Sequence, residues 1–169
     1  MENDLSVLTR LELAKDWVRD TGNFLKENIA APLEITEKTR YDDLVTNFDK
    51  EVQEQIVANI LHHFPEDKIL AEEDEEKIKF DSEIPHLWVL DPIDGTTNFI
   101  VQKDNFAVML AYYEYGVGKF GLILDVMKDK LSYEFGPLIY VSSSTECDNT
   151  TLAKLVLKNK MDYDDFSVL

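Results

Sequence analysis

Acidic side chains follow two short apolar segments of this sequence, and such a placement is typical of metal chemistry. Asp91 comes directly after the apolar run 87–90, with Asp94 three residues later, and Glu72 comes directly after the short segment K-I-L-A at 68–71. Two strands that end at the same edge of a sheet would bring these three carboxylates together. Carboxylates are ligands of Mg²⁺, which commonly combines one or two of them with phosphate oxygens of a substrate. The spacing therefore predicts a magnesium site suited to hydrolysis of a phosphate ester.

The residues after the second aspartate predict a place for the phosphate itself. Gly95 allows a sharp turn or a close approach of the backbone. Thr96, Thr97 and Asn98 are of types that cap helices, so a helix is expected to begin there. The first N–H groups of a helix can bind phosphate. Pro92, which has no N–H, indicates that the preceding strand cannot simply continue through it.

Both acidic segments also have plainer interpretations. The segment 91–95 could be a surface turn, since Asp, Pro and Gly are all common turn residues. An EF-hand is excluded, because its loop needs acidic groups at alternate positions and a late Glu. The acidic run 72–76 could be a solvated loop. Its position directly after a strand favours a ligand at Glu72, with Glu73 as a second candidate.

The rest of the chain predicts the elements that must position these residues. An amphipathic helix is expected over 4–29, followed by a loop or short hairpin over 33–43. A second helix is expected to have Thr46 as its N-cap, with Asp49 placed as in a capping box, and to close at Pro65. Strands are expected at 68–71 and 87–90, then an antiparallel meander at 106–115, 120–126 and 130–135, and a last helix from Asn149 or Thr150 to about Lys160.

Composition restricts the class of protein. At 169 residues the chain is long enough for one sizeable core and short for two full domains. The 34 acidic and 17 basic residues give a net charge of −17, which argues against nucleic acid and anionic membranes as partners. A single cysteine, Cys147, is compatible with a reducing compartment, so a cytoplasmic protein is expected. A chain this acidic needs bound cations in order to hold a phosphate.

The sequence resembles the inositol monophosphatase family of metal-dependent, lithium-sensitive phosphomonoesterases. The segment D-P-I-D-G-T-T-N-F at 91–99 matches the family signature residue for residue. Further motifs appear in the family's order and spacing, namely D-L-V-T-x-x-D at 43–49, F-P at 64–65, and A-E-E at 71–73 in place of the usual G-E-E. The resemblance covers about residues 5–135. It implies an α+β fold, the layered αβ sandwich of inositol monophosphatase-like sugar phosphatases.

The resemblance implies a metal centre with defined ligands. Glu72, Asp91 and Asp94, with the main-chain carbonyl of Ile93, would bind two or three Mg²⁺ ions. Li⁺ would act as an inhibitor. Lys38 stands at the spacing of a family lysine, a weaker match than the acidic residues.

The resemblance also implies catalytic and substrate-binding roles. The hydroxyl of Thr96, paired with Asp49, would orient or deprotonate the attacking water, with Glu72 as a further catalytic residue. Gly95 and Thr96 would hold the substrate phosphate through backbone N–H groups, and Asp94 would also contact the substrate. The implied activity is Mg²⁺-dependent hydrolysis of a small phosphomonoester, inositol 1-phosphate or a related sugar phosphate, by a homodimer.

The sequence departs from the family after residue 135. The family's G-x-G-A-x-x-N turn and the W-D-x-A-x-G motif, whose Asp is a metal ligand, are not found in it. We therefore expect an N-terminal metal- and phosphate-binding domain over 1–135, an atypical segment over 136–169, and a fold that lacks much of the C-terminal half. One alternative is a catalytically weak or inactive metal-binding member. Another is a haloacid-dehalogenase-type phosphatase, although its motif D-x-D-G-T has one residue between the aspartates and this sequence has two.

Overall fold

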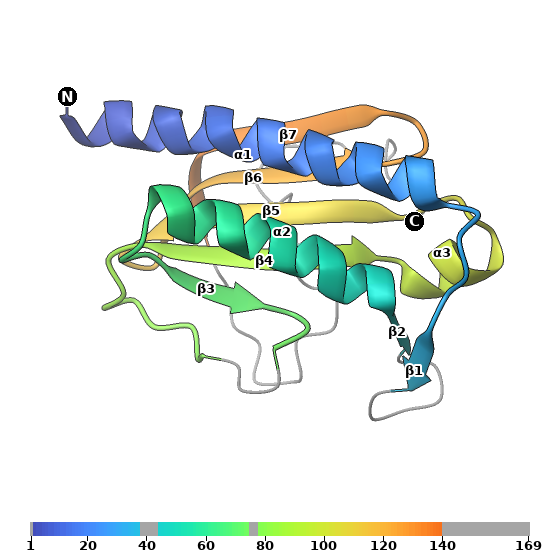
Figure 1. Ribbon diagram of the computed structural model, residues 1–169. Helices are drawn as coiled ribbons and strands as arrows, with labels where there is room; N and C mark the ends of the chain where they lie inside the picture. The colour runs from blue at the N-terminus through green and yellow to red at the C-terminus, as the bar shows by residue number, and fades with distance from the viewer. Residues whose placement is uncertain (1, 38–43, 75–77, 140–169) are drawn as a thin grey trace.

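The computed structural model describes residues 2–37, 44–74 and 78–139 (Figure 1). Within these ranges, two long helices lie over one face of a five-stranded sheet (Figure 1). A two-stranded sheet and a short helix lie near one end of the larger sheet (Figure 1). This layered mixture of helices and sheet confirms the predicted α+β class. The described helices include none with the length and apolar character needed to cross a membrane.

The larger sheet places the predicted strands side by side. Its strands lie in the order β3-β4-β5-β6-β7. The first two are parallel and the later pairs are antiparallel, which confirms the predicted meander. The strand bounds are β3 Lys68–Ala71, β4 Leu87–Asp94, β5 Ala107–Glu114, β6 Val117–Asp125 and β7 Lys130–Ile139. The smaller sheet pairs β1 (Ile35–Glu37) with β2 (Leu44–Thr46).

The helices begin close to where the sequence predicts. Helix α1 spans Glu2–Asn28 and helix α2 spans Asn47–His63. Thr46 is the N-cap of α2, and its hydroxyl accepts a hydrogen bond from the N–H of Phe48 at 3.2 Å. Asp49 Oδ2 in turn accepts from the N–H of Thr46 at 2.7 Å. This reciprocal pair is the predicted capping box.

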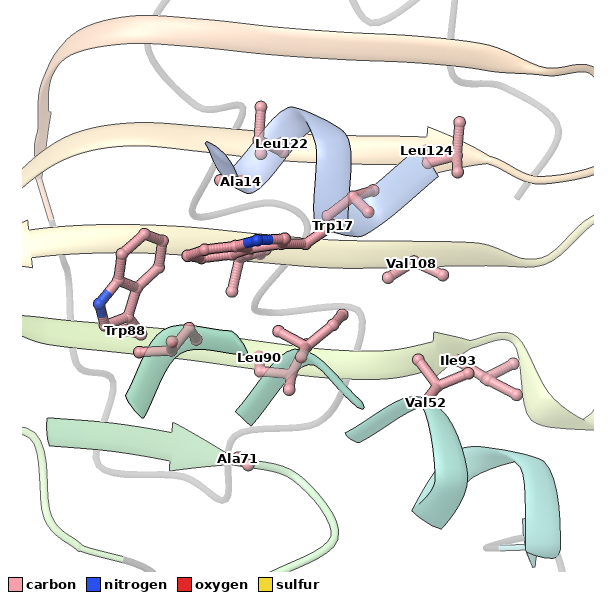
Figure 2. Packing of buried hydrophobic residues seen from close by; sticks show 14 of the residues in the cluster. Ala14, Trp17, Val52, Ala71, Trp88, Leu90, Ile93, Val108, Leu122 and Leu124 are labelled. Carbon is pink, nitrogen blue, oxygen red and sulfur yellow. The ribbon is translucent and has the colours of Figure 1, made fainter. Parts of the chain in front are cut away.

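The core lies between the helices and the sheet (Figure 2). Alternate strand residues point toward the helices, because successive side chains of a strand lie on opposite faces. Burial of each large apolar side chain here contributes about 1.5–3 kcal/mol. Gly22 lets α1 approach β6, since a Cβ at that position would overlap the Leu124 side chain. Labelled core residues are Ala14 and Trp17 on α1, Val52 on α2, and Ala71, Trp88, Leu90, Ile93, Val108, Leu122 and Leu124 (Figure 2).

Strand β4 corrects the expectation that Pro92 ends it. The strand continues to Asp94, with a register shift against β5 between Asp91 and Asp94. Strand β3 pairs with β4 only as far as Leu90, so Pro92 lies beyond that partner and within the irregular part of the β5 pairing. A proline is tolerated at such an irregularity because no regular ladder bond is lost.

Two further boundaries differ from the predictions. Helix α3 spans Thr96–Val101, and its N-cap is Gly95 in the left-handed region, not a threonine or asparagine side chain. The turn between β5 and β6 consists of Tyr115 and Gly116. Gly118, which falls between the strands expected at 106–115 and 120–126, therefore lies within β6.

The predicted helix 149–160, Cys147 and Lys38 lie outside the described residues. The division of the chain at residue 135 stays a prediction, and β7 extends across it to Ile139.

Candidate active site

The parallel pairing of β3 and β4 brings two of the predicted acids side by side. Ala71 at the end of β3 is the register partner of Leu90 on β4. The next residue, Glu72, donates its N–H to the carbonyl of Leu90 at 3.0 Å. Glu72 therefore lies beside Asp91, the residue that follows Leu90. The arrangement follows from two short apolar runs that end in register, as the sequence predicts.

Asp91 carries a buried carboxylate just beyond the last register pair of β3 and β4. The residue is 1% exposed, and neither carboxylate oxygen has a hydrogen-bond partner among the described residues. Burial is the main cause that raises the pKa of the Asp91 carboxyl well above its usual range, followed by the charge of Glu72, a proton-sharing contact with the Glu72 side chain, and the charges of Asp94 and Asp49. A buried charge without compensation is costly in a folded protein. Asp91 is therefore a buried acid whose two oxygens are left unsatisfied by residues 2–37, 44–74 and 78–139.

Asp94 follows Asp91 on β4, after the register shift against β5, and its side chain is half-buried. Burial and the charge of Glu72 raise the pKa of the Asp94 carboxyl to about 6. Across residues 2–37, 44–74 and 78–139, no three His, Cys, Asp or Glu side chains converge as a ready-made metal site. Glu72, Asp91 and Asp94 still act on one another electrostatically, as neighbouring like charges do.

Thr96 links the start of α3 to the start of α2. Its hydroxyl lies 3.1 Å from Asp49 Oδ1 and 2.9 Å from the carbonyl oxygen of Ile93, and its one proton can be donated to either. Asp49 is 1% exposed, and its other oxygen, Oδ2, accepts from both the N–H and the hydroxyl of Thr46. Asp49 therefore caps α2 with one oxygen and binds Thr96 with the other.

Gly95 combines a positive φ with close packing against the backbone of Asn105. Its φ is +83°, and a Cβ there would lie 3.1 Å from the carbonyl oxygen of Asn105. Asn98 also donates a hydrogen bond to this carbonyl, at 3.1 Å. The backbone at the start of α3 is thus held close to the segment that leads into β5. Glycine is the residue that accepts both the positive φ and the close approach.

A family model described as the inositol monophosphatase family matches residues 7–155. The chain belongs to the inositol monophosphatase family. Inositol-1-monophosphatase of Bacillus subtilis strain 168 is 41% identical to it over 124 residues, which are 73% of this chain and 46% of the relative. The match sets aside the haloacid-dehalogenase alternative. It also extends past residue 135, where the resemblance read from the sequence stops.

Solved structures of this family share the fold. A staphylococcal inositol monophosphatase in a LiCl-soaked inhibitory complex has a TM-score of 0.71 and 32% identity, covering 76% of this chain and 48% of that one. An IMPase/NADP phosphatase complexed with Mg²⁺ and phosphate has a TM-score of 0.69 and 31% identity, covering 77% of this chain and 49% of that one. This inositol monophosphatase family chain spans about half the length of the relatives it matches.

The comparisons support metal-dependent phosphatase chemistry at the family level. They give no support to the expectation that nucleic acid is excluded as a partner. The homodimer and the cytoplasmic location stay predictions.

The residues present fit a hard divalent cation. The observation that decides this is the Asp91 carboxylate, whose two buried oxygens lack hydrogen-bond partners within the described part of the chain. The neighbouring donors, Glu72, Asp94 and the Ile93 carbonyl, are all oxygens, which is the donor type that Mg²⁺ prefers. A cation would also relieve the repulsion that raises the pKa values of Asp91 and Asp94.

The structure adds a polar residue that the sequence reasoning missed. Gln53 on α2 is 9% exposed and binds the loop that follows β3. Its Oε1 accepts from the N–H of Glu73 at 3.0 Å, and its Nε2 donates to Asp74 Oδ1 at 2.8 Å. A sequence signal was available, because Gln53 follows Asp49 by four residues and so shares its side of the helix.

A second buried polar cluster, also missed, lies where β3 and β4 begin, at the opposite end of this strand pair from Asp91. Asp67 accepts from Nε and Nη2 of Arg10, each at 3.2 Å, and from Nε1 of Trp88 at 2.9 Å. The Arg10 guanidinium also lies over the rings of Phe64 and Tyr112, at 4.0 and 5.1 Å from their centroids. The partners of Asp67 are distant in sequence, so no local spacing indicates them.

Proposed function

We propose that this chain hydrolyses a small phosphomonoester, inositol 1-phosphate or a related sugar phosphate, with Mg²⁺ and water. The observation that carries the proposal is Asp91, a buried carboxylate with no hydrogen-bond partner among the described residues, beside Glu72 and Asp94. Family membership gives the reaction class. The related phosphatase with bound Mg²⁺ and phosphate supports this choice of metal and ligand.

We propose that Glu72, Asp91, Asp94 and the Ile93 carbonyl hold two or three Mg²⁺ ions. When bound, Mg²⁺ supplies positive charge that lowers the pKa of the attacking water and offsets charge on the phosphate and the leaving oxygen. Li⁺ is expected to inhibit by competing for this site. The LiCl-soaked inhibitory complex of the staphylococcal relative supports that expectation.

Thr96 and Asp49 are proposed to take the proton of the attacking water. With its own proton donated to Asp49 Oδ1, the Thr96 oxygen can accept a hydrogen bond from water. As the water oxygen bonds to phosphorus, its proton passes to Thr96, whose own proton passes to Asp49. Glu72 would assist by orienting the same water. The ester P–O bond breaks, the alcohol oxygen takes a proton from solvent, and no covalent enzyme intermediate forms.

The start of α3 is proposed to bind the phosphate. The N–H groups of Gly95 and Thr96 are at the helix start, where backbone N–H groups lack partners within the helix. Asp94 is proposed to contact the substrate as well as the metal. The positive φ and tight packing at Gly95 support a fixed backbone at this point.

A second candidate function is metal binding without turnover. The family's W-D-x-A-x-G aspartate is not found in this sequence, and the chain spans about half of each relative. Such a protein would bind Mg²⁺ through the same acids and release no phosphate.

Phosphate release from inositol 1-phosphate separates the two functions. We expect Mg²⁺-dependent release by the 169-residue chain, lowered by about 10³-fold or more in Asp91→Asn, because the variant loses a charged ligand at the site. Circular dichroism would check that the variant is folded. Mg²⁺ binding with no release by the wild-type chain would favour the second function. Wild-type-like release by Asp91→Asn would contradict the ligand assignment.

A substitution at Thr96 tests the proton path. Thr96→Val removes the hydroxyl at nearly constant shape and should lower kcat by about 10- to 100-fold, with Mg²⁺ affinity little changed. Thr96→Ser should retain most of the rate, and Thr97→Val, at the exposed neighbouring position, is the matched control. An unchanged kcat in Thr96→Val would remove Thr96 from the mechanism.

A further inference from the structure

Helix α2 reaches the candidate site at two positions one turn apart. Asp49, in the first turn, binds Thr96 at the start of α3. Gln53 follows on the same side and binds the loop after β3. Positions four apart on a helix lie one above the other. One rigid element therefore contacts both segments that carry the proposed catalytic and metal-binding groups.

Gln53 makes two hydrogen bonds of opposite sense with this loop. Its carbonyl oxygen accepts from the N–H of Glu73 at 3.0 Å, and its amide nitrogen donates to the Asp74 carboxylate at 2.8 Å. A primary amide can do both while remaining neutral, because it carries one acceptor and one donor group. Gln53 is nearly buried, so these bonds are poorly accessible to competing water.

The two bonds bear on the backbone that presents Glu72. The N–H of Glu72 is held by the Leu90 carbonyl of β4, and the next N–H, that of Glu73, is held by Gln53. The peptide groups on both sides of the Glu72 Cα are thus anchored, one to the sheet and one to α2. We propose that Gln53 is a positioning residue that fixes Glu72 for metal binding. The inference rests on the proposed function only in taking Glu72 as a ligand.

A neutral amide also suits the charge of this region. Glu72, Glu73 and Asp74 are consecutive acids, and Asp91 and Asp94 lie nearby. A glutamate at position 53 could still accept from the N–H of Glu73. It would lose the donor to Asp74 and place a like charge against that carboxylate.

The test measures Mg²⁺ affinity of the full chain by isothermal titration, independently of turnover. Gln53→Leu should weaken Mg²⁺ binding by about 10- to 100-fold, the usual effect of removing a residue that orients a metal ligand. Gln55→Leu is the matched control, since it makes the same chemical change on the same helix at a more exposed position. Unchanged Mg²⁺ affinity in folded Gln53→Leu would overturn the proposal.

A reciprocal exchange covers the case in which Gln53→Leu fails to fold. Gln53→Glu alone should weaken Mg²⁺ binding, because two carboxylates then face each other. The double variant Gln53→Glu/Asp74→Asn carries the amide on the loop and the carboxylate on the helix, at the wild-type net charge. It should recover most of the lost affinity, since the hydrogen bond re-forms with donor and acceptor exchanged. Equal loss in the single and double variants would contradict the positioning role.

Amide hydrogen exchange at Glu73 in metal-free protein separates this inference from the proposed function. Gln53→Leu should increase the exchange rate of that N–H, and Gln55→Leu should not. Normal phosphate release together with unaltered Mg²⁺ affinity and exchange in Gln53→Leu would refute the inference and leave the function standing. Absent phosphate release, with Mg²⁺ affinity still dependent on Gln53, would refute the function and support the inference.

Discussion

Asp67 and Asp91 are buried carboxylates at opposite ends of the β3–β4 pair, and they differ in what surrounds them. Asp67 precedes β3 and accepts hydrogen bonds from two nitrogens of Arg10 and from the indole of Trp88. Asp91 lies beyond the last β3–β4 register pair, and its two oxygens accept none from the residues that the structure describes. The first acid is satisfied by the fold, and the second is surrounded by other acids.

This difference separates an acid that stabilises the fold from one that we propose binds a metal ion. A buried charge paired with a guanidinium and an indole needs nothing further. A buried charge beside other carboxylates raises the free energy of the folded state until a cation or a proton neutralises it. The two acids should therefore respond in opposite directions when each is replaced by a neutral residue.

The largest effect on stability is expected at the satisfied acid. Asp67→Ala should lower the free energy of unfolding by about 3–5 kcal/mol, because it leaves Arg10 buried without a counter-charge. Urea unfolding of the metal-free chain measures this loss. Lys128→Ala, which breaks a surface ion pair with Asp125, should give no measurable change. A loss at Asp67 as small as that of the control would contradict the assignment of the first cluster as structural.

A smaller effect is expected from the titration of Asp94. Its pKa is about 6 in the folded chain, above the ordinary value of 3.8. A raised carboxyl pKa means that the folded state binds the proton more tightly than the unfolded state does. The contribution of Asp94 to the free energy of unfolding is therefore greatest below pH 3.8 and is lost as the pH rises through about 6. The loss is at most about 3 kcal/mol from this group.

The measurement is urea unfolding of metal-free protein between pH 4 and pH 7. Comparison with Asp94→Asn isolates the contribution of Asp94 from the general repulsion in a chain of net charge −17. The wild-type stability should fall more steeply with pH than that of the variant. Parallel profiles would show that Asp94 does not titrate as the structure implies.

An effect of opposite sign to that of Asp67→Ala is expected at the unsatisfied acid. Asp91→Asn should raise the free energy of unfolding of the metal-free chain by about 2 kcal/mol at pH 7.5, because a neutral amide replaces a buried carboxylate near other acids. Saturating Mg²⁺ should stabilise the wild type and not the variant. Urea unfolding in EDTA and in Mg²⁺ gives both values. A less stable variant in EDTA would show that Asp91 is satisfied by the fold after all.

The sequence was informative wherever the determining contacts are local. The capping box of Thr46 and Asp49 lies within four residues, and the structure confirms it. The acids after β3 and β4 follow apolar runs that can be seen directly in the chain. The strand end predicted at Pro92 was wrong. Whether a strand can contain a proline depends on where the neighbouring strand ends and where the register shifts, and neither can be seen in the local sequence.

Contacts between distant segments could not be predicted from the sequence. Arg10 and Asp67 are 57 residues apart, and Gln53 and Asp74 are 21 apart. Spacing places Gln53 on the same side of α2 as Asp49, but no neighbour in the chain identifies Asp74 as its partner, or Asp67 as the partner of Arg10. Their partners become apparent only after the helices have packed on the sheet. The same holds for the Thr96–Asp49 contact, which family resemblance supplied and spacing did not.

The double use of Asp49 has an evolutionary consequence. Its carboxylate completes the cap of α2 and also binds Thr96, so a change at this position should reduce stability and activity together. At Asp91 the two properties conflict, since a neutral residue would favour the metal-free fold and abolish the proposed reaction. A descendant freed from selection for catalysis would therefore be expected to lose the aspartate at position 91 early and to retain the one at position 49.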